Sequence, residues 1–91
     1  MFTHICVGAD DLQASQKFYD AVLTPLGVKS AGPISDRACM YSTDTGTLLV
    51  LKPANNEAAC HANGGTIGFQ APDAAAVDAF HAAGLANGGS D

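Results

Sequence analysis

The amino-acid sequence predicts an α+β fold, in which a β-α-β-β-β module is followed by the β-α start of a second module. One observation is a run of apolar residues at helical spacing that follows a strand-like segment near the N-terminus. Another is a tight turn between two β-forming segments, which indicates a hairpin. The third is a second strand-then-helix pattern, because Ile5 aligns with Ile67, Asp11 with Asp73 and Phe18 with Phe80 when the chain is slid along itself.

The first module is expected to span residues 1–53. Its opening strand is predicted over residues 2–9, where β-forming side chains alternate, and either Asp10 or Asp11 is expected to cap the next helix. Apolar residues recur near helical spacing from Leu12 to Leu23, and Pro25 and Gly27 end the helix. Three strands are predicted to follow, over about residues 27–30, 37–43 and 47–52. Within the helix, Phe18 is expected to be buried against the sheet.

A linker and a shorter second module are predicted for the rest of the chain. Residues 54–64 are rich in Asn and Ala and show neither helical nor strand periodicity. The second module is expected to cover residues 65–91, with a strand at TIGFQA and an alanine-rich helix from Ala74 to Ala83. We expect the linker and both modules to form one domain.

Composition limits the kinds of partner that the protein can have. A net charge of -5 with only four Lys and Arg residues argues against nucleic acid, whose phosphates need clustered basic side chains. The longest aliphatic run, LLVL, is far shorter than the roughly 20 residues that cross a bilayer. Three widely spaced cysteines, Cys6, Cys39 and Cys60, fit reduced thiols better than a disulfide framework. We therefore expect a cytoplasmic protein that contacts neither nucleic acid nor membrane.

The segment from Asp11 to Gly27 has the pattern D-L-x-x-S-x-x-F-Y-x-x-V-L-x-x-L-G. With the paired modules and the His-containing first strand, this pattern resembles the glyoxalase, bleomycin-resistance and extradiol-dioxygenase superfamily, also called vicinal oxygen chelate proteins. The resemblance covers essentially the whole chain. It implies a cupped mixed sheet with helices on its outer face, which holds a small ligand, often over a divalent metal bound by His and Glu.

The resemblance can be tested at each position where it implies a metal ligand. His4 matches the ligand on the first strand, but the carboxylate position falls near Leu49, which cannot coordinate a metal. The next position falls on Thr66, and the last would lie on a strand that the sequence does not contain. Since a catalytic metal needs about three protein ligands, we expect a degenerate metal site. His4 is then a lone metal ligand, a catalytic acid-base group, or a strand histidine bonded to backbone or water; a divalent metal is not favoured.

Strand alternation predicts which side chains line the cup. His4 and Cys6 share one face of the first strand, while Ile5 and Val7 share the other. The expected lining is completed by Tyr41 or Met40, depending on register, and by Thr47, Leu49, Leu51, Thr66, Gly68 and Gln70. Such a surface could bind a small apolar molecule through a few polar groups, or could instead be filled as part of a small core.

Two functions from different classes stay open. One is a glyoxalase-type enzyme that resembles lactoylglutathione lyase, or another small-molecule lyase or isomerase, with His4 in the site. The other is a metal-independent protein of the bleomycin-resistance type, which sequesters a small molecule without chemistry. A third reading is that this chain has no activity alone.

The second module raises a question of assembly, because a strand and a helix cannot close a cup. Its unpaired strand edge invites pairing with another chain. Either the native chain continues beyond Asp91, or a second copy completes the sheet as a homodimer. Both readings predict that a 91-residue monomer is unstable.

Overall fold

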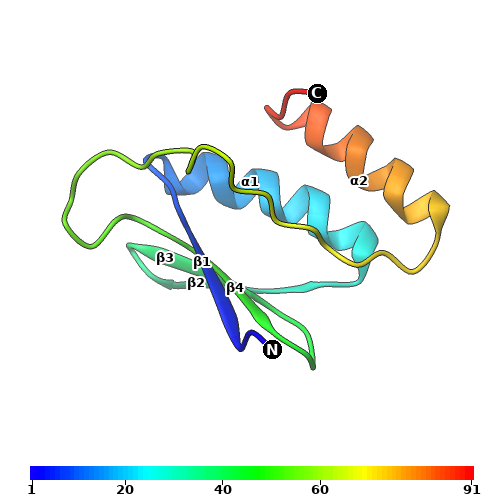
Figure 1. The fold of residues 1–91 in the computed structure, drawn as a ribbon, viewed down its shortest axis with the longest axis horizontal. Helices are drawn as coiled ribbons and strands as arrows, with labels where there is room; N and C mark the ends of the chain where they lie inside the picture. The colour runs from blue at the N-terminus through cyan, green and yellow to red at the C-terminus, as the bar shows by residue number, and fades with distance from the viewer.

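The structure, a computed structural model, describes all 91 residues and has a four-stranded mixed sheet with two helices on one side of it (Figure 1). This architecture confirms the predicted α+β fold class. The elements in chain order are β1 (His4–Gly8), α1 (Leu12–Leu23), a 3-10 turn η1 (Thr24–Leu26), β2 (Lys29–Ser35), β3 (Ala38–Ser42), β4 (Thr47–Leu51) and α2 (Ala74–Ala86). The strand order is β1-β4-β3-β2, in which β1 runs parallel to β4 and the other pairs are antiparallel. None of the helices is long and apolar enough to cross a membrane.

Helix α1 begins and ends where the sequence indicates. The Asp11 side chain accepts a hydrogen bond of 3.0 Å from the Ala14 amide, which satisfies one of the free N–H groups of the first turn. After η1, Gly27 adopts a left-handed conformation with φ of 77°, and its N–H donates to the Thr24 carbonyl. Glycine takes this conformation without the steric cost that a Cβ imposes, so the chain can turn directly into β2.

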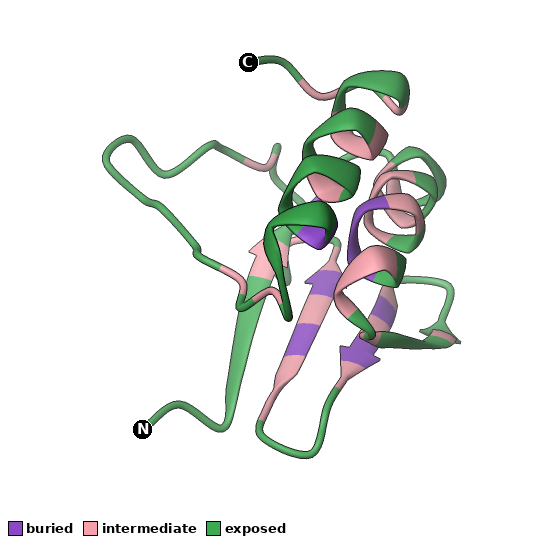
Figure 2. Ribbon diagram, turned by 90° about the vertical axis from the view of Figure 1, so that its right-hand side faces the viewer, coloured by how far each residue is buried: buried purple, intermediate pink, exposed green.

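The core lies between α1 and the centre of the sheet (Figure 2). Val22 and Leu23 of α1 are buried against alternate residues of the two central strands, where burial follows the period of two that strands impose. The strand residues that complete this cluster are Cys39, Tyr41, Leu48 and Val50. By contrast, β1 lies at the edge of the sheet and only its Val7 is partly buried.

Helix α2 packs on α1 rather than on a sheet. A Cβ added to Gly84 would lie 3.6 Å from Val22 Cγ1 and 3.8 Å from Phe18 Cε2, which shows how closely the two helices approach. Phe18 packs against the core beside α2 and is only half-buried, so the expectation that it is buried between helix and sheet is wrong in its extent. Tyr19 takes the sheet-facing position, with its ring centroid 6.1 Å from that of Tyr41.

The strand expected at residues 66–71 does not form. The segment is mostly exposed, and no backbone hydrogen bond involves any of its residues. A β-strand exists only when a neighbouring strand takes up its N–H and C=O groups, and no strand of this chain lies alongside. The segment instead passes along the helix side of the sheet and leads into α2, whose first turn is capped by the Asp73 side chain (Figure 1).

Candidate ligand-binding site

The face of the sheet that points away from the helices carries the side chains that the sequence marks as a candidate site. Because Leu48 and Val50 of β4 are buried on the helix side, the alternate residues of β4 and their neighbours must lie on the other side. The register places Cys6 beside Leu49, and Leu49 beside Met40. We call this surface the open face; its side chains are His4, Cys6, Ala38, Met40, Ser42, Thr47, Leu49 and Leu51.

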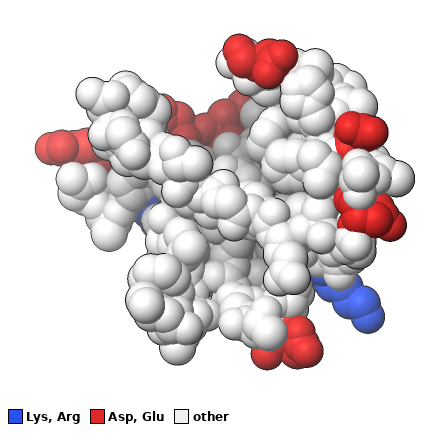
Figure 3. All heavy atoms as spheres, turned by 45° about the vertical axis from the view of Figure 1, so that its right-hand side comes forward, with Lys and Arg blue, Asp and Glu red and all other residues white.

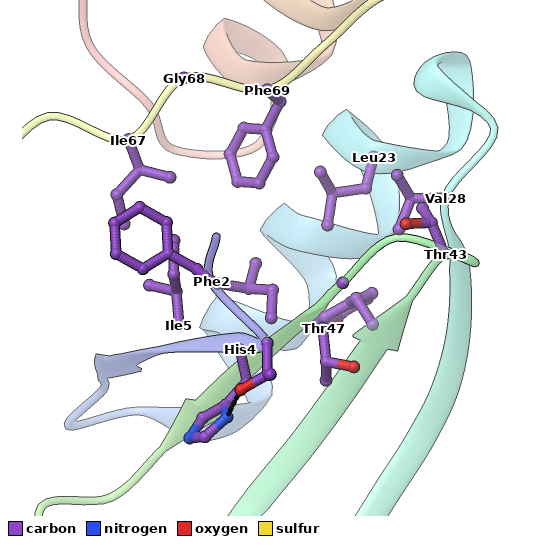
Figure 4. Close-up of a pocket in the computed structure, with 14 residues that line it drawn as sticks. Phe2, His4, Ile5, Leu23, Val28, Thr43, Thr47, Ile67, Gly68 and Phe69 are labelled. Atoms are coloured by element: carbon purple, nitrogen blue, oxygen red, sulfur yellow. Dashed lines mark hydrogen bonds between the residues drawn. The ribbon is translucent and has the colours of Figure 1, made fainter.

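His4 lies at one end of the open face, where β1 begins. It is exposed and stands opposite Thr47 in the register. Its Nδ1 is 2.9 Å from the hydroxyl of Thr3, and the ring points away from Phe2 and Ile67 on the helix side (Figure 4). Nε2 has no partner within the chain, so it is the ring atom available to a ligand on the open face.

The surroundings of His4 do not fit a divalent metal centre. No three side chains among the His, Cys, Asp and Glu residues lie close enough together to hold a metal ion. The neighbours of His4 in the register are Cys6, Thr47 and Leu49, of which only the exposed thiol of Cys6 is a metal donor of the usual kind. Within this chain, the open face therefore offers an imidazole, a thiol and hydroxyls around an apolar centre.

Tyr41 does not lie on the open face, and its predicted place in the ligand-binding lining is corrected by the register. Tyr41 pairs with Leu48, so it points toward α1 and is only 1% exposed. Its hydroxyl donates to Asp20 Oδ1 at 2.8 Å. Met40 occupies the open-face position instead. The sequence could have shown this, because Ser42 and Thr47 form the first pair on either side of the turn at residues 44–46. Counting two residues outward along each strand then pairs Met40 with Leu49 on the same face.

Burial controls the ionisation of the groups around Tyr41. Loss of water raises the pKa of the Tyr41 hydroxyl, and its hydrogen bond to the Asp20 carboxylate raises it further. Burial also raises the pKa of the Cys39 thiol and of the Tyr19 hydroxyl. These groups stay protonated at neutral pH, so they stabilise the fold and are poorly suited to nucleophilic chemistry.

Thr66, Gly68 and Gln70 also lie away from the open face. They belong to the unpaired segment that runs on the helix side, where Gly68 lies near Ile67 and Phe69 (Figure 4), and Gln70 is near Leu26. Their predicted place beside His4 would require residues 66–71 to extend the sheet next to β1. Of the predicted lining, this chain thus brings together His4, Cys6, Thr47, Leu49 and Leu51.

Comparison with known proteins identifies the family. No protein-family model matches the chain, and no curated protein matches it. A solved glyoxalase/bleomycin resistance protein from Albidiferax ferrireducens T118 is 45% identical, with a TM-score of 0.91, and the match covers 97% of this chain and 72% of that one. The chain belongs to the glyoxalase/bleomycin resistance family. A lactoylglutathione lyase from Agrobacterium tumefaciens is 24% identical with a TM-score of 0.59, covering 94% of this chain and 69% of that one, and this likeness shows the fold alone.

Membership of the glyoxalase/bleomycin resistance family confirms the resemblance that the Asp11 to Gly27 pattern indicated. That pattern builds α1, η1 and the turn into β2, so it reports the fold and carries no information on the reaction. On the open face of this chain, Leu49 occupies the position at which the resemblance implies a carboxylate.

Proposed function

We propose that the protein binds a small molecule on its open face without a metal, as a sequestering member of the glyoxalase/bleomycin resistance family. The observation that supports this most directly is the pairing of Met40, Leu49 and Cys6 at the centre of that face. Their side chains are apolar or soft, and Met40 and Leu49 remain partly exposed because no helix covers them. Hydroxyls of Ser42 and Thr47, 3.2 Å apart, add a polar edge.

These groups suit the recognition of a molecule with a large uncharged part. Apolar contact supplies most of the binding free energy in such a site, while a few polar groups orient the ligand. The methionine side chain adapts to ligands of different shape. The protein carries a net charge of -5, and on the side shown in Figure 3 acidic side chains lie toward the margin of a largely uncharged surface, so strongly anionic ligands are not expected to be attracted.

We further propose that a second copy of the chain completes this site as a homodimer. Besides the outer edge of β2, two segments are unpaired in one copy, namely the outer edge of β1 and residues 66–71. If β1 of each copy pairs with residues 66–71 of the other, a two-fold axis relates two identical strand pairings. The free N–H and C=O groups of both segments then find partners in each copy. This arrangement would bring Thr66, Gly68 and Gln70 of the partner beside the open face.

Light scattering at two protein concentrations tests the proposed homodimer. Ile67→Lys is expected to shift the measured mass to that of a monomer, and Lys52→Ala is the control that should keep the mass of the parent.

The ligand proposal is tested by thermal shift with a panel of compounds that includes bleomycin and lactoylglutathione. A ligand at 100 times its Kd is expected to stabilise the protein by about 2.7 kcal/mol. Leu49→Glu should abolish the shift, because it places a charge in the apolar centre, while Val77→Ala on the exposed side of α2 should preserve it. Binding that survives Leu49→Glu would contradict the open face as the site.

A second candidate is a lyase-type reaction in which His4 transfers a proton. The free Nε2 atom at the edge of the open face favours it, since a general base must reach its substrate through such an atom. The two candidates differ in metal content and in the response to His4→Ala. The sequestering protein should hold well under one equivalent of Ni, Zn, Co or Mn and keep its ligand affinity in His4→Ala. One full equivalent of metal in the parent, lost in His4→Ala together with the turnover of lactoylglutathione, would favour the lyase.

We place the protein in the cytoplasm on the support of its three free cysteines.

A further inference from the structure

A cavity lies on the helix side of the sheet, opposite the open face. It has a volume of about 180 Å³ and is enclosed by the end of α1, the start of β1, the β3-β4 hairpin and residues 67–69 (Figure 4). Nothing in the proposed function uses it, because the open-face side chains point the other way. The side chains that form it include Phe2, Ile5, Leu23, Val28, Leu48 and Phe69.

The floor of this cavity is rigid and presents carbon atoms. Leu23 is 1% exposed and Leu48 is 7% exposed, and both belong to the packed core. Tyr41 also contributes to the floor, but its hydroxyl is already engaged with Asp20 and the Gln16 carbonyl. The tyrosine therefore offers the cavity its ring and no free hydrogen-bonding group.

The walls and mouth are also apolar. Phe69 is held at one wall by a tilted aromatic contact with Phe80, whose centroid lies 6.2 Å away. Phe2 and Ile67, 71% and 40% exposed, stand close together at the mouth (Figure 4). The lining contains no Asp, Glu, Lys or Arg side chain, and the His4 ring points toward the open face, so threonine hydroxyls are the polar side-chain groups that remain.

We propose that this cavity binds a small uncharged molecule with an aromatic ring or a short hydrocarbon chain. A cavity of about 150 Å³ lined by Leu, Ile and Phe stays dry and binds benzene, because water finds too few polar partners there. The cavity here is similar in size and lining, and its open mouth provides a route of entry. Phe2 lies outside any helix or strand and can pack on a bound molecule together with Ile67. Charged molecules are excluded, since no side chain in the lining would compensate their lost hydration.

Toluene serves as the probe, and NMR of the full chain locates it. We expect saturable shifts in the methyl resonances of Leu23, Val28 and Leu48, with those of Met40 and Leu49 on the open face unchanged. Val28→Phe fills the cavity from its half-buried wall and should weaken toluene binding at least tenfold. Val77→Ala is the matched control, because Val77 is exposed on α2 and lies outside the lining of the cavity, so it should leave the affinity unchanged.

Ile67→Trp provides a second variant that leaves the core untouched, since Ile67 lies at the exposed mouth. It should also weaken binding at least tenfold while light scattering shows the same mass as for the parent, because Ile67 also belongs to the proposed dimer contact. The proposal is overturned if toluene gives no saturable shifts, or if Val28→Phe and Ile67→Trp both bind it as tightly as the parent. Shifts confined to Met40 and Leu49 would overturn it as well, because toluene would then occupy the open face. An affinity that falls as protein concentration rises would show that a second copy fills the cavity, which also overturns it.

Discussion

Replacing Tyr41 by phenylalanine removes one hydroxyl from the core and leaves the ring in place. Tyr41 is 1% exposed, and its hydroxyl donates to Asp20 Oδ1 at 2.8 Å and lies 3.2 Å from the Gln16 carbonyl. A hydrogen bond to a charged group contributes about 1.5 to 3 kcal/mol to stability. We therefore expect Tyr41→Phe to lower the free energy of unfolding by that amount at pH 7. The loss is large for a small domain, whose total stability is about 5 to 15 kcal/mol.

The same substitution should change how stability depends on pH. The pKa of Tyr41 is raised in the folded state by burial and by Asp20, whereas in the unfolded chain it is near 10. Above pH 10 the unfolded chain thus loses this proton while the folded protein keeps it, so stability falls as pH rises. The fall from this one group is at most about 1.4 kcal/mol per pH unit. Below pH 9 the group contributes no slope.

Urea unfolding between pH 7 and pH 11 measures both effects. In Tyr41→Phe the alkaline slope should become shallower, so that its stability approaches that of the parent as pH rises. Some slope should remain, because the pKa values of Cys39 and Tyr19 are also raised by burial. A double-mutant cycle with Asp20→Ala isolates the hydrogen bond, with a coupling of about 1 kcal/mol or more expected. Equal stability of parent and Tyr41→Phe at pH 7, with identical alkaline slopes, would refute the reasoning.

Two further substitutions test the helical layer. Phe18→Ala should destabilise the protein by about 1 to 3 kcal/mol, below the 3 to 5 kcal/mol typical of a core phenylalanine, because Phe18 is half-buried beside α2; a loss above 4 kcal/mol in urea unfolding would contradict this placement. Gly27→Ala should cost about 1 to 2 kcal/mol through its φ of 77° alone, since a Cβ there meets no atom within 4 Å. Calorimetry that finds Gly27→Ala neutral would show that the turn rearranges freely.

The first module could be predicted well because each of its elements has a local cause. The Asp11 cap, the apolar spacing of α1 and the turn at residues 44–46 are all set by residues close in sequence. The predicted helix over residues 12–23 is confirmed at both ends. Strand β2 runs to Ser35, beyond the predicted end at residue 30, because its pairing with β3 continues through two register shifts that local patterns do not reveal.

Features that depend on distant partners could not be predicted in the same way. TIGFQA has the composition of a strand, but its backbone finds no neighbour within the chain and it stays unpaired. Phenylalanine is a residue type typical of a core, yet Phe18 stays only half-buried where α2 approaches α1. In both cases the sequence specifies the local preference, and the tertiary arrangement decides whether that preference is realised.

The placement of Met40 and Tyr41 shows how much of the site rests on a single register. The side chains of a strand alternate with a period of two, so a shift of one residue would exchange the thioether on the open face for a phenol. The shift would also leave the Tyr41 hydroxyl without Asp20, and it would carry Cys39 of the same strand out of the core. The core therefore fixes the register, and the register in turn fixes the open face as apolar. The metal-free binding that we propose for this face rests on the same packing that buries Tyr41, because Leu49 and Met40 are the side chains that the buried set leaves for it.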